Sequence, residues 1–188
     1  MSDPPLFDFV APLIYPQAVI FILTGAVGSG KTSILKALTS SLREAEIAFD
    51  GFLSLRVLEN ERRVGYDLLD LQDGRREPFL RINEKPEEQR VGRFSVLPPG
   101  LSLAGRIIDR SRAAELLIVD EIGPLELAGE GLWPALKEAM RDVRRKFCVV
   151  VRDGLVDDVH GLFPGHEIEI LECGGNALPA LMAAIRKP

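Results

Sequence analysis

The residues best suited to chemistry begin with a glycine-rich stretch. Residues 25–32 read Gly-Ala-Val-Gly-Ser-Gly-Lys-Thr, which fits the phosphate-loop pattern G-x-x-x-x-G-K-[ST]. Glycines let successive backbone N–H groups converge on one anion, and the N-terminus of a following helix adds favourable partial charge. In this pattern the lysine bridges the β- and γ-phosphates of a nucleotide, and the next hydroxyl is a ligand of Mg²⁺. The predicted nucleotide contacts are Gly25, Ala26, Val27, Gly28, Ser29, Gly30, Lys31, Thr32 and Ser33, with Lys31 also catalytic and Thr32 a metal ligand.

A pair of adjacent carboxylates follows an apolar run near the middle of the chain. Residues 116–119 are Leu-Leu-Ile-Val, and Asp120 and Glu121 come directly after them. This pattern is typical of a strand that carries a metal-binding aspartate at the C-terminal edge of a sheet. Because neighbouring side chains along a strand point in different directions, Glu121 is free to face a water molecule near the γ-phosphate. We expect Asp120 to share Mg²⁺ with Thr32, and Glu121 to act as the general base or to position the water.

Alternating strand and helix patterns surround these two motifs. The apolar run at 18–24 has the character of a strand buried on both faces, and residues 32–45 repeat apolar side chains at helical spacing. Two β-rich runs with polar residues between them indicate a hairpin. The expected strands are 18–24, 52–58, 64–71, 78–82, 116–119, 147–151 and 167–171, with a surface loop at 83–93 and helices at 32–45, 101–114, 131–145, 155–162 and 177–185.

This succession predicts one α/β domain. Strands that alternate with helices pack into a mostly parallel sheet covered on both faces, and the hairpin would be an insertion in that sheet. A length of 188 residues suits a single core. We therefore expect residues 18–188 to form one P-loop domain and residues 1–17, which carry four prolines, to form an extended N-terminal arm.

Composition and charge argue against several classes of protein. With 46% hydrophobic and 27% charged residues the chain is an ordinary globular protein, and its net charge of −5 argues against a protein that coats nucleic acid. Cys148 and Cys173 lack metal-site spacing and are expected to be free thiols in a reducing compartment. Pro12 and Pro16 interrupt the uncharged stretch at 9–30, which argues against a membrane span or a signal peptide. We expect a cytoplasmic protein with no membrane or nucleic-acid partner, and the sequence identifies no protein partner.

The motifs together resemble those of a known family. The phosphate loop is accompanied by Gly51-Phe-Leu-Ser-Leu-Arg56, by Gly92-Arg-Phe-Ser-Val96 and by Asp120-Glu-Ile-Gly-Pro-Leu-Glu-Leu127. Over about residues 18–187 this combination resembles the small P-loop nucleoside-triphosphatases of the cancer-related NTPase type, which have archaeal and bacterial members. The resemblance implies a RecA-like sheet and slow, Mg²⁺-dependent hydrolysis of ATP, GTP and other nucleoside triphosphates.

Several other side chains are candidates for supporting roles. Arg93 lies in the family-like stretch and is our choice for stabilising charge near the nucleotide. The alternatives for that role are Arg106, Arg110 and Arg152. Asn176 is either a contact to the base or a helix cap, and Glu126 either holds the turn after Asp120 or is exposed. The basic residues expected to interact with the C-terminal dipole of a helix are Arg141, Arg144, Arg145 and Lys146.

Three classes of function fit these residues. A hydrolase is favoured because Asp120 and Glu121 supply both a metal ligand and a water activator. In a nucleotide or small-molecule kinase, Asp50 would accept a proton from the acceptor hydroxyl, and residues 72–93 would form a lid. In an adaptor, a partner would read the nucleotide-bound state. Asn176 is the one candidate for reading the base, and the chain has no Asn-Lys-x-Asp element, so we expect weak selectivity between bases.

Overall fold

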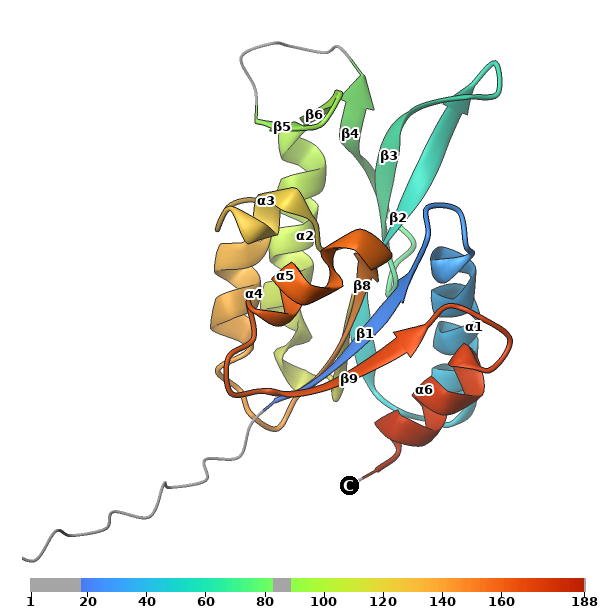
Figure 1. Ribbon diagram of the computed structural model, residues 1–188, viewed down its shortest axis with the longest axis vertical. Coiled ribbons are helices and arrows are strands. Elements are labelled where there is room, and N and C mark those ends of the chain that lie inside the picture. The colour runs from blue at the N-terminus through green and yellow to red at the C-terminus, as the bar shows by residue number, and fades with distance from the viewer. Residues whose placement is uncertain (1–17, 83–88, 188) are drawn as a thin grey trace, which may run out of the picture.

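The computed structural model describes residues 18–82 and 89–187, so the expected N-terminal arm lies outside the described residues. Within these ranges one sheet has the strand order β5-β6-β4-β3-β2-β7-β8-β1-β9, with helices on both faces (Figure 1). The strands are β1 (Val19–Gly25), β2 (Phe49–Glu59), β3 (Arg62–Asp70), β4 (Arg76–Ile82), β5 (Arg90–Val91), β6 (Phe94–Val96), β7 (Leu116–Val119), β8 (Lys146–Arg152) and β9 (Glu167–Glu172). The helices are α1 (Lys31–Glu44), α2 (Pro98–Arg110), α3 (Pro124–Leu127), α4 (Trp133–Ala139), α5 (Val156–His160) and α6 (Ala177–Ile185). None of the helices in the described ranges is long and apolar enough to cross a membrane.

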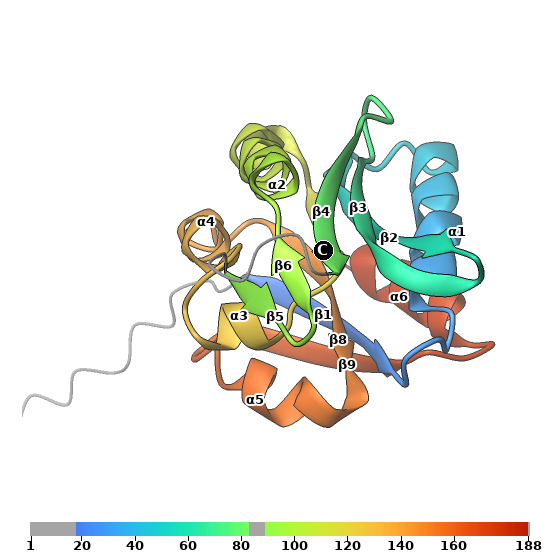
Figure 2. The same ribbon diagram turned by 90° about the horizontal axis from the view of Figure 1, so that it is seen from above.

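The centre of the sheet is parallel and is buried on both faces. β1 lies between β8 and β9, and β7 lies between β8 and β2, all in parallel register. Successive side chains of β1 alternate between two cores: Ile20 and Ile22 pack on the α2 and α4 side, whereas Phe21 and Leu23 pack on the α1 and α6 side. Figure 2 shows these two pairs of helices on opposite faces of the sheet. Burial on both faces explains why β1 is a continuous apolar run.

The other half of the sheet is antiparallel. β2 pairs with β3, β3 with β4, β4 with β6 and β6 with β5, each in antiparallel register. The first five residues of β2 are buried, and the first four of them pair with β7. The rest of the strand pairs with β3 and is partly exposed. In the described residues four strand pairings are parallel and four are antiparallel, so the expected mostly parallel sheet is corrected to a mixed sheet.

The helix expected at 131–145 is shorter than its apolar periodicity indicates. α4 has a proline in its first turn and ends at Ala139. The carboxylate of Asp142 then accepts a hydrogen bond from the backbone N–H of Arg144 (3.2 Å), a local bond that competes with helix continuation. α5 is also shorter than expected. It covers residues 156–160 of the predicted helix at 155–162, and a 3-10 turn at 153–155 precedes it.

The basic residues after α4 do not act together on its C-terminal dipole, which corrects that expectation. Arg145 is buried and donates from Nη2 to Ser111 Oγ (2.7 Å). Lys146 Nζ donates to the carbonyl oxygens of Ile185 (2.7 Å) and Lys187, at the C-terminal end of α6. Arg141 and Arg144 form ion pairs with Glu138 and Asp142. The lysine therefore does stabilise a helix C-terminus, but that of a different helix.

Part of the segment expected as a loop or lid is strand. Residues 76–82 form β4, and residues 90–91 form β5, which pairs with β6. Residues 83–88 lie outside the described residues. This segment therefore contributes to the antiparallel edge of the sheet.

Candidate functional site

The glycine-rich stretch joins the end of β1 to the start of α1. β1 ends at Gly25, and Lys31 is the first residue of the helix, so the loop lies at the helix N-terminus. Gly28 and Gly30 adopt φ angles of 87° and 98°, which residues with a side chain rarely occupy, and this conformation turns the backbone through the loop. The backbone arrangement suits an anion held by N–H groups at a helix N-terminus.

The side chain of Lys31 folds back across this loop. It is buried, and Nζ donates hydrogen bonds to the carbonyl oxygens of Gly25 and Ala26, the latter at 2.9 Å. The ammonium group is therefore held at the mouth of the loop, where a phosphate-binding lysine is expected.

Asp120 reaches the loop from the end of β7. Thr32 Oγ1 donates to Asp120 Oδ2 (2.9 Å), which joins residues 88 positions apart in the chain. The backbone N–H of Ser54 donates to the same oxygen (3.2 Å). Burial raises the pKa of Asp120 to about 7 and the Glu121 carboxylate adds to the rise, whereas the hydrogen bonds from Thr32 and Ser54 oppose it. This buried carboxylate beside a hydroxyl is an environment in which a cation would be stabilised.

Glu121 has different surroundings although it follows Asp120 directly. The two residues are joined by a cis peptide bond. Glu121 Oε1 forms an ion pair with Nε of Arg152, the last residue of β8, at 2.6 Å. Its side chain is 26% exposed and lines the same cavity as Lys31. One carboxylate is thus buried against the loop while the other is accessible to solvent.

These side chains line a cavity of about 440 Å³ at the C-terminal ends of the parallel strands. Among the described residues that line it, five are basic and two are acidic, in a chain whose net charge is −5. The basic residues are Lys31, Lys36, Arg56, Arg76 and Arg152. Such a local excess of positive charge suits a polyanionic ligand.

The predicted loop contacts divide into two groups. Those that line the cavity are Val27, Gly28, Gly30, Lys31, Thr32 and Ser33. The other three, Gly25, Ala26 and Ser29, do not line it, and their carbonyl oxygens bind side chains of the protein. Ser29 O accepts a hydrogen bond from Cys173 Sγ (3.0 Å), which ties the loop to the end of β9.

Of the four arginines considered from the sequence, only Arg152 is among the described residues that line the cavity. Arg93 lies between β5 and β6, where Nη2 donates to the carbonyl oxygen of Arg63 (3.1 Å). Arg106 is exposed on α2 and donates to Ser102 Oγ (2.8 Å). The structure therefore does not bring Arg93, our choice from the sequence, to this cavity.

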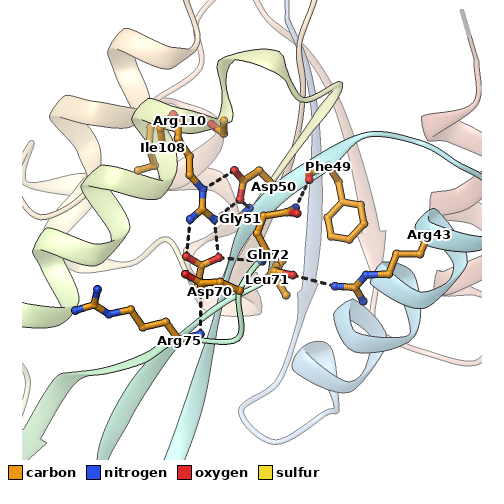
Figure 3. Close-up of polar contacts among 12 residues, drawn as sticks. Arg43, Phe49, Asp50, Gly51, Asp70, Leu71, Gln72, Arg75, Ile108 and Arg110 are labelled. Carbon is orange, nitrogen blue, oxygen red and sulfur yellow. Dashed lines mark hydrogen bonds and ion pairs between the residues drawn. The ribbon is translucent and has the colours of Figure 1, made fainter.

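Arg110 and Asp50 belong to a separate cluster (Figure 3). Nε and Nη2 of Arg110 donate to the two carboxylate oxygens of Asp50 (2.9 and 2.8 Å). Asp50 lies inside β2, opposite Leu117 in β7, two residues before β7 ends at the cavity side. The carboxylate expected as a kinase base is therefore bound by an arginine and does not line the cavity, which corrects that expectation.

The structure also places the two residues for which the sequence left alternatives open. Glu126 is buried and holds the turn after Asp120, because it accepts hydrogen bonds from the backbone N–H groups of Gly123 (2.9 Å) and Leu132 (3.1 Å). Burial raises the pKa of Glu126, and these hydrogen bonds oppose the rise. Asn176 occupies the N-cap position of α6 without a side-chain capping bond, and it is not among the described residues that line the cavity.

The antiparallel strands also contribute side chains to the cavity, and no sequence motif indicated them. Ser54, Arg56, Tyr66 and Arg76, from β2, β3 and β4, all line the cavity. A partial signal exists, because residues two apart on a strand share a face and β2 runs beside the strand that ends at Asp120. Using that signal requires the register between β2 and β7, which residue types alone do not provide.

This chain is similar to proteins named nucleoside-triphosphatase. A family profile described as NTPase matches residues 20–172. The nucleoside-triphosphatase THEP1 of Methanopyrus kandleri is 33% identical over 119 residues, which is 63% of this chain and 65% of that protein, slightly less than two thirds. The protein of the same name from Archaeoglobus fulgidus is 31% identical over 150 residues, 78% of this chain and 87% of that protein.

A solved structure shares the fold. The solution structure of a human cancer-related nucleoside triphosphatase superposes with a TM-score of 0.71 at 22% identity, covering 90% of this chain and 98% of that one. At this identity the likeness shows the α/β fold. Because the profile covers most of the chain, the protein belongs to the NTPase family.

Proposed function

We propose that this protein hydrolyses nucleoside triphosphates such as ATP and GTP to the diphosphate and phosphate, with Mg²⁺. The observation that carries the proposal is the 2.9 Å hydrogen bond between Thr32 and Asp120, which brings the phosphate loop and the strand-end carboxylate together beside Glu121. Membership of the NTPase family supports the same reaction.

The donor set at this point fits Mg²⁺. This ion prefers oxygen ligands, keeps several waters and is usually held by one or two carboxylates together with substrate phosphates. Thr32 Oγ1 and Asp120 Oδ2 are such oxygens, and the described residues contain no cluster of three or more His, Cys, Asp or Glu that would form a complete cage. When bound, the ion would neutralise charge on the β- and γ-phosphate oxygens.

The remaining steps belong to the chain's own residues. Lys31 and the loop N–H groups would hold the β- and γ-phosphates. Glu121 Oε would take a proton from the attacking water as its oxygen bonds to the γ-phosphorus, and the bond from that phosphorus to the bridging oxygen would break to release the diphosphate. Arg152 orients Glu121 through the ion pair at 2.6 Å. An accessible, oriented carboxylate next to the loop supports hydrolysis rather than nucleotide binding alone.

The test is phosphate release by the purified protein from ATP and GTP, with Mg²⁺ and with excess EDTA. We expect turnover that requires the metal and that falls by at least about 100-fold in Lys31→Ala, because a charge on the β/γ-phosphates is lost. Lys137→Ala, on the exposed side of α4, is the matched control and should keep the parent rate. Equal turnover in the parent and in Lys31→Ala would refute the role of the loop.

A further inference from the structure

Three arginines line the cavity, and they differ in what they bind. Arg152 is engaged with the carboxylate of Glu121. Arg56 and Arg76, from β2 and β4, are exposed, and neither guanidinium group has a hydrogen bond or ion pair with another residue in the described part of the chain. A guanidinium group without a protein partner beside a phosphate loop is available for a ligand.

Arg56 is the one of these two that lies over the loop. A Cβ atom placed on Gly28 would be 3.6 Å from Arg56 Nη2, so the guanidinium faces the loop at Gly28 and is close to it. Gly28 itself lines the cavity. The Arg56 side chain therefore stands on the opposite wall from the loop and reaches across to it.

The backbone of Arg56 is fixed in register with the metal-binding carboxylate. Arg56 pairs with Tyr66 in the antiparallel ladder between β2 and β3, and Tyr66 also lines the cavity. Two residues earlier on β2, the backbone N–H of Ser54 donates to Asp120 Oδ2 (3.2 Å). Residues two apart on a strand share a face, so the strand that contacts Asp120 also presents Arg56 to the cavity.

We propose that Arg56 contacts the terminal phosphate of the bound nucleotide and stabilises the charge that develops on it during hydrolysis. The proposal rests on the proposed function and adds to it a catalytic arginine supplied by the same chain. The planar guanidinium matches two phosphate oxygens at once, which a lysine does not. Because the diphosphate lacks the terminal group, the contact distinguishes a nucleoside triphosphate from its product.

The experiment compares Arg56→Ala and Arg56→Lys with the parent. Arg62→Ala is the matched control, since Arg62 is an exposed residue of the same hairpin and is not among the described residues that line the cavity. We measure kcat and KM for ATP with Mg²⁺, and by calorimetry the affinities for ADP and for a non-hydrolysable ATP analogue.

Arg56→Ala should lower kcat by about 100- to 1000-fold, the usual effect of removing one group that stabilises the transition state. It should also weaken the triphosphate analogue about tenfold more than ADP, with Arg56→Lys intermediate and Arg62→Ala unchanged. A kcat within about threefold of the parent, or equal weakening of analogue and ADP, would overturn the proposal. If the parent itself releases no phosphate, the proposed function fails first, and the difference between analogue and ADP still decides whether Arg56 contacts the terminal phosphate.

Discussion

At the scale of single residues, Asp120 and Glu121 are neighbours with unequal surroundings. Asp120 is 3% exposed and accepts hydrogen bonds from the Thr32 hydroxyl and a backbone N–H. Glu121 is accessible and is held by Arg152. A buried carboxylate bound to the loop suits a metal ligand, whereas an accessible carboxylate held by a cation suits a group that exchanges protons with water.

Amide substitutions should therefore separate the two roles. In Glu121→Gln, ATP affinity should stay within about threefold while kcat falls about 100-fold, because an amide does not accept the proton. Asp120→Asn should instead weaken ATP binding in Mg²⁺ far more than in EDTA. Calorimetry and phosphate release measure both, with the exposed Glu44→Gln on α1 as control. Parent turnover in Glu121→Gln would show that this carboxylate does not take the proton from the attacking water.

The two free thiols should differ in reactivity. Cys148 is fully buried, and burial raises the pKa of its thiol to about 12, whereas Cys173 is partly exposed. Because Cys173 Sγ bonds the carbonyl of Ser29 in the loop, a bound nucleotide should slow its modification. We expect one thiol to react in the native protein and two after unfolding, measured with a chromogenic disulfide reagent. Labelling of native Cys173→Ser at the parent rate would contradict this assignment.

The residues of the two motifs could be selected from the sequence, whereas the arginine that we propose for the site could not. Lys31, Thr32, Asp120 and Glu121 are recognisable because each type is required at a fixed offset from a loop or strand. An arginine that acts across a cavity has no such offset, because its place depends on which strands pair and in what register. Arg56 therefore became visible only with the structure.

At the scale of elements, Arg110 at the end of α2 joins the helix to two strands (Figure 3). It binds both oxygens of Asp50 in β2, and its Nη1 and Nη2 donate to Asp70 in β3 at 2.7 and 2.5 Å. Both aspartates are buried, with exposures of 6% and 1%. Without this arginine, two close carboxylates would be left without a partner of opposite charge in the cluster.

Arg110→Met should consequently destabilise the fold. Removing one partner of a fully buried pair costs about 3–5 kcal/mol. Because the Arg110 side chain is 38% exposed and solvent screens part of the interaction, we expect about 2 kcal/mol. Urea unfolding at pH 7 with an unchanged m value would measure the loss, and the exposed Arg112→Met is the control. A difference below about 0.5 kcal/mol would show that the cluster contributes little to stability.

The same cluster predicts how stability depends on pH. Burial alone raises the pKa of Asp70, but hydrogen bonds from Arg110 and from the backbone of Gln72 outweigh it and hold the pKa below its ordinary value of 3.8. The unfolded chain then binds this proton more readily than the folded chain, so the stabilisation is present above pH 3.8 and is lost as pH falls through the folded pKa. Unfolding free energies between pH 6 and 3 should decline less steeply in Asp70→Asn than in the parent or in the exposed Asp157→Asn. Equal slopes would contradict the assignment.

The sequence predicted the boundaries of an element closely where a strand is buried on both faces. β1 and β7 are buried on both faces, and their apolar runs define them closely. β2 combines a parallel, buried first half with an antiparallel, exposed second half, so no single periodicity describes it. α4 ends early because a local Asp142 hydrogen bond competes with apolar spacing that would continue the helix.

At the scale of the whole molecule, charge is distributed unevenly. The chain carries a net −5, yet the described residues that line the cavity are five basic and two acidic. Such an arrangement attracts a polyanion to one end of an otherwise acidic protein. This positive charge would attract the phosphates, which all nucleoside triphosphates share, and it would not distinguish one base from another.

Hydrolysis should therefore be slow and weakly selective for the base. Strong discrimination needs polar groups at the base edge that would be left unpaired by the wrong base. Asn176, the candidate from the sequence, is not among the described residues that line the cavity. We expect ATP and GTP to be turned over within about tenfold of each other, or about 1.4 kcal/mol in transition-state binding.

A G-protein α subunit, whose arginine is supplied by the same chain, turns over at only about 10⁻² per second, and we expect a rate near this value. Initial rates of phosphate release with ATP, GTP, CTP and UTP at saturating Mg²⁺ provide the measurement. A preference of about a thousandfold for one base, or about 4 kcal/mol, would require positioned donors and acceptors at the base edge. In that case contacts to the base, and not the positive charge of the cavity, would select the substrate.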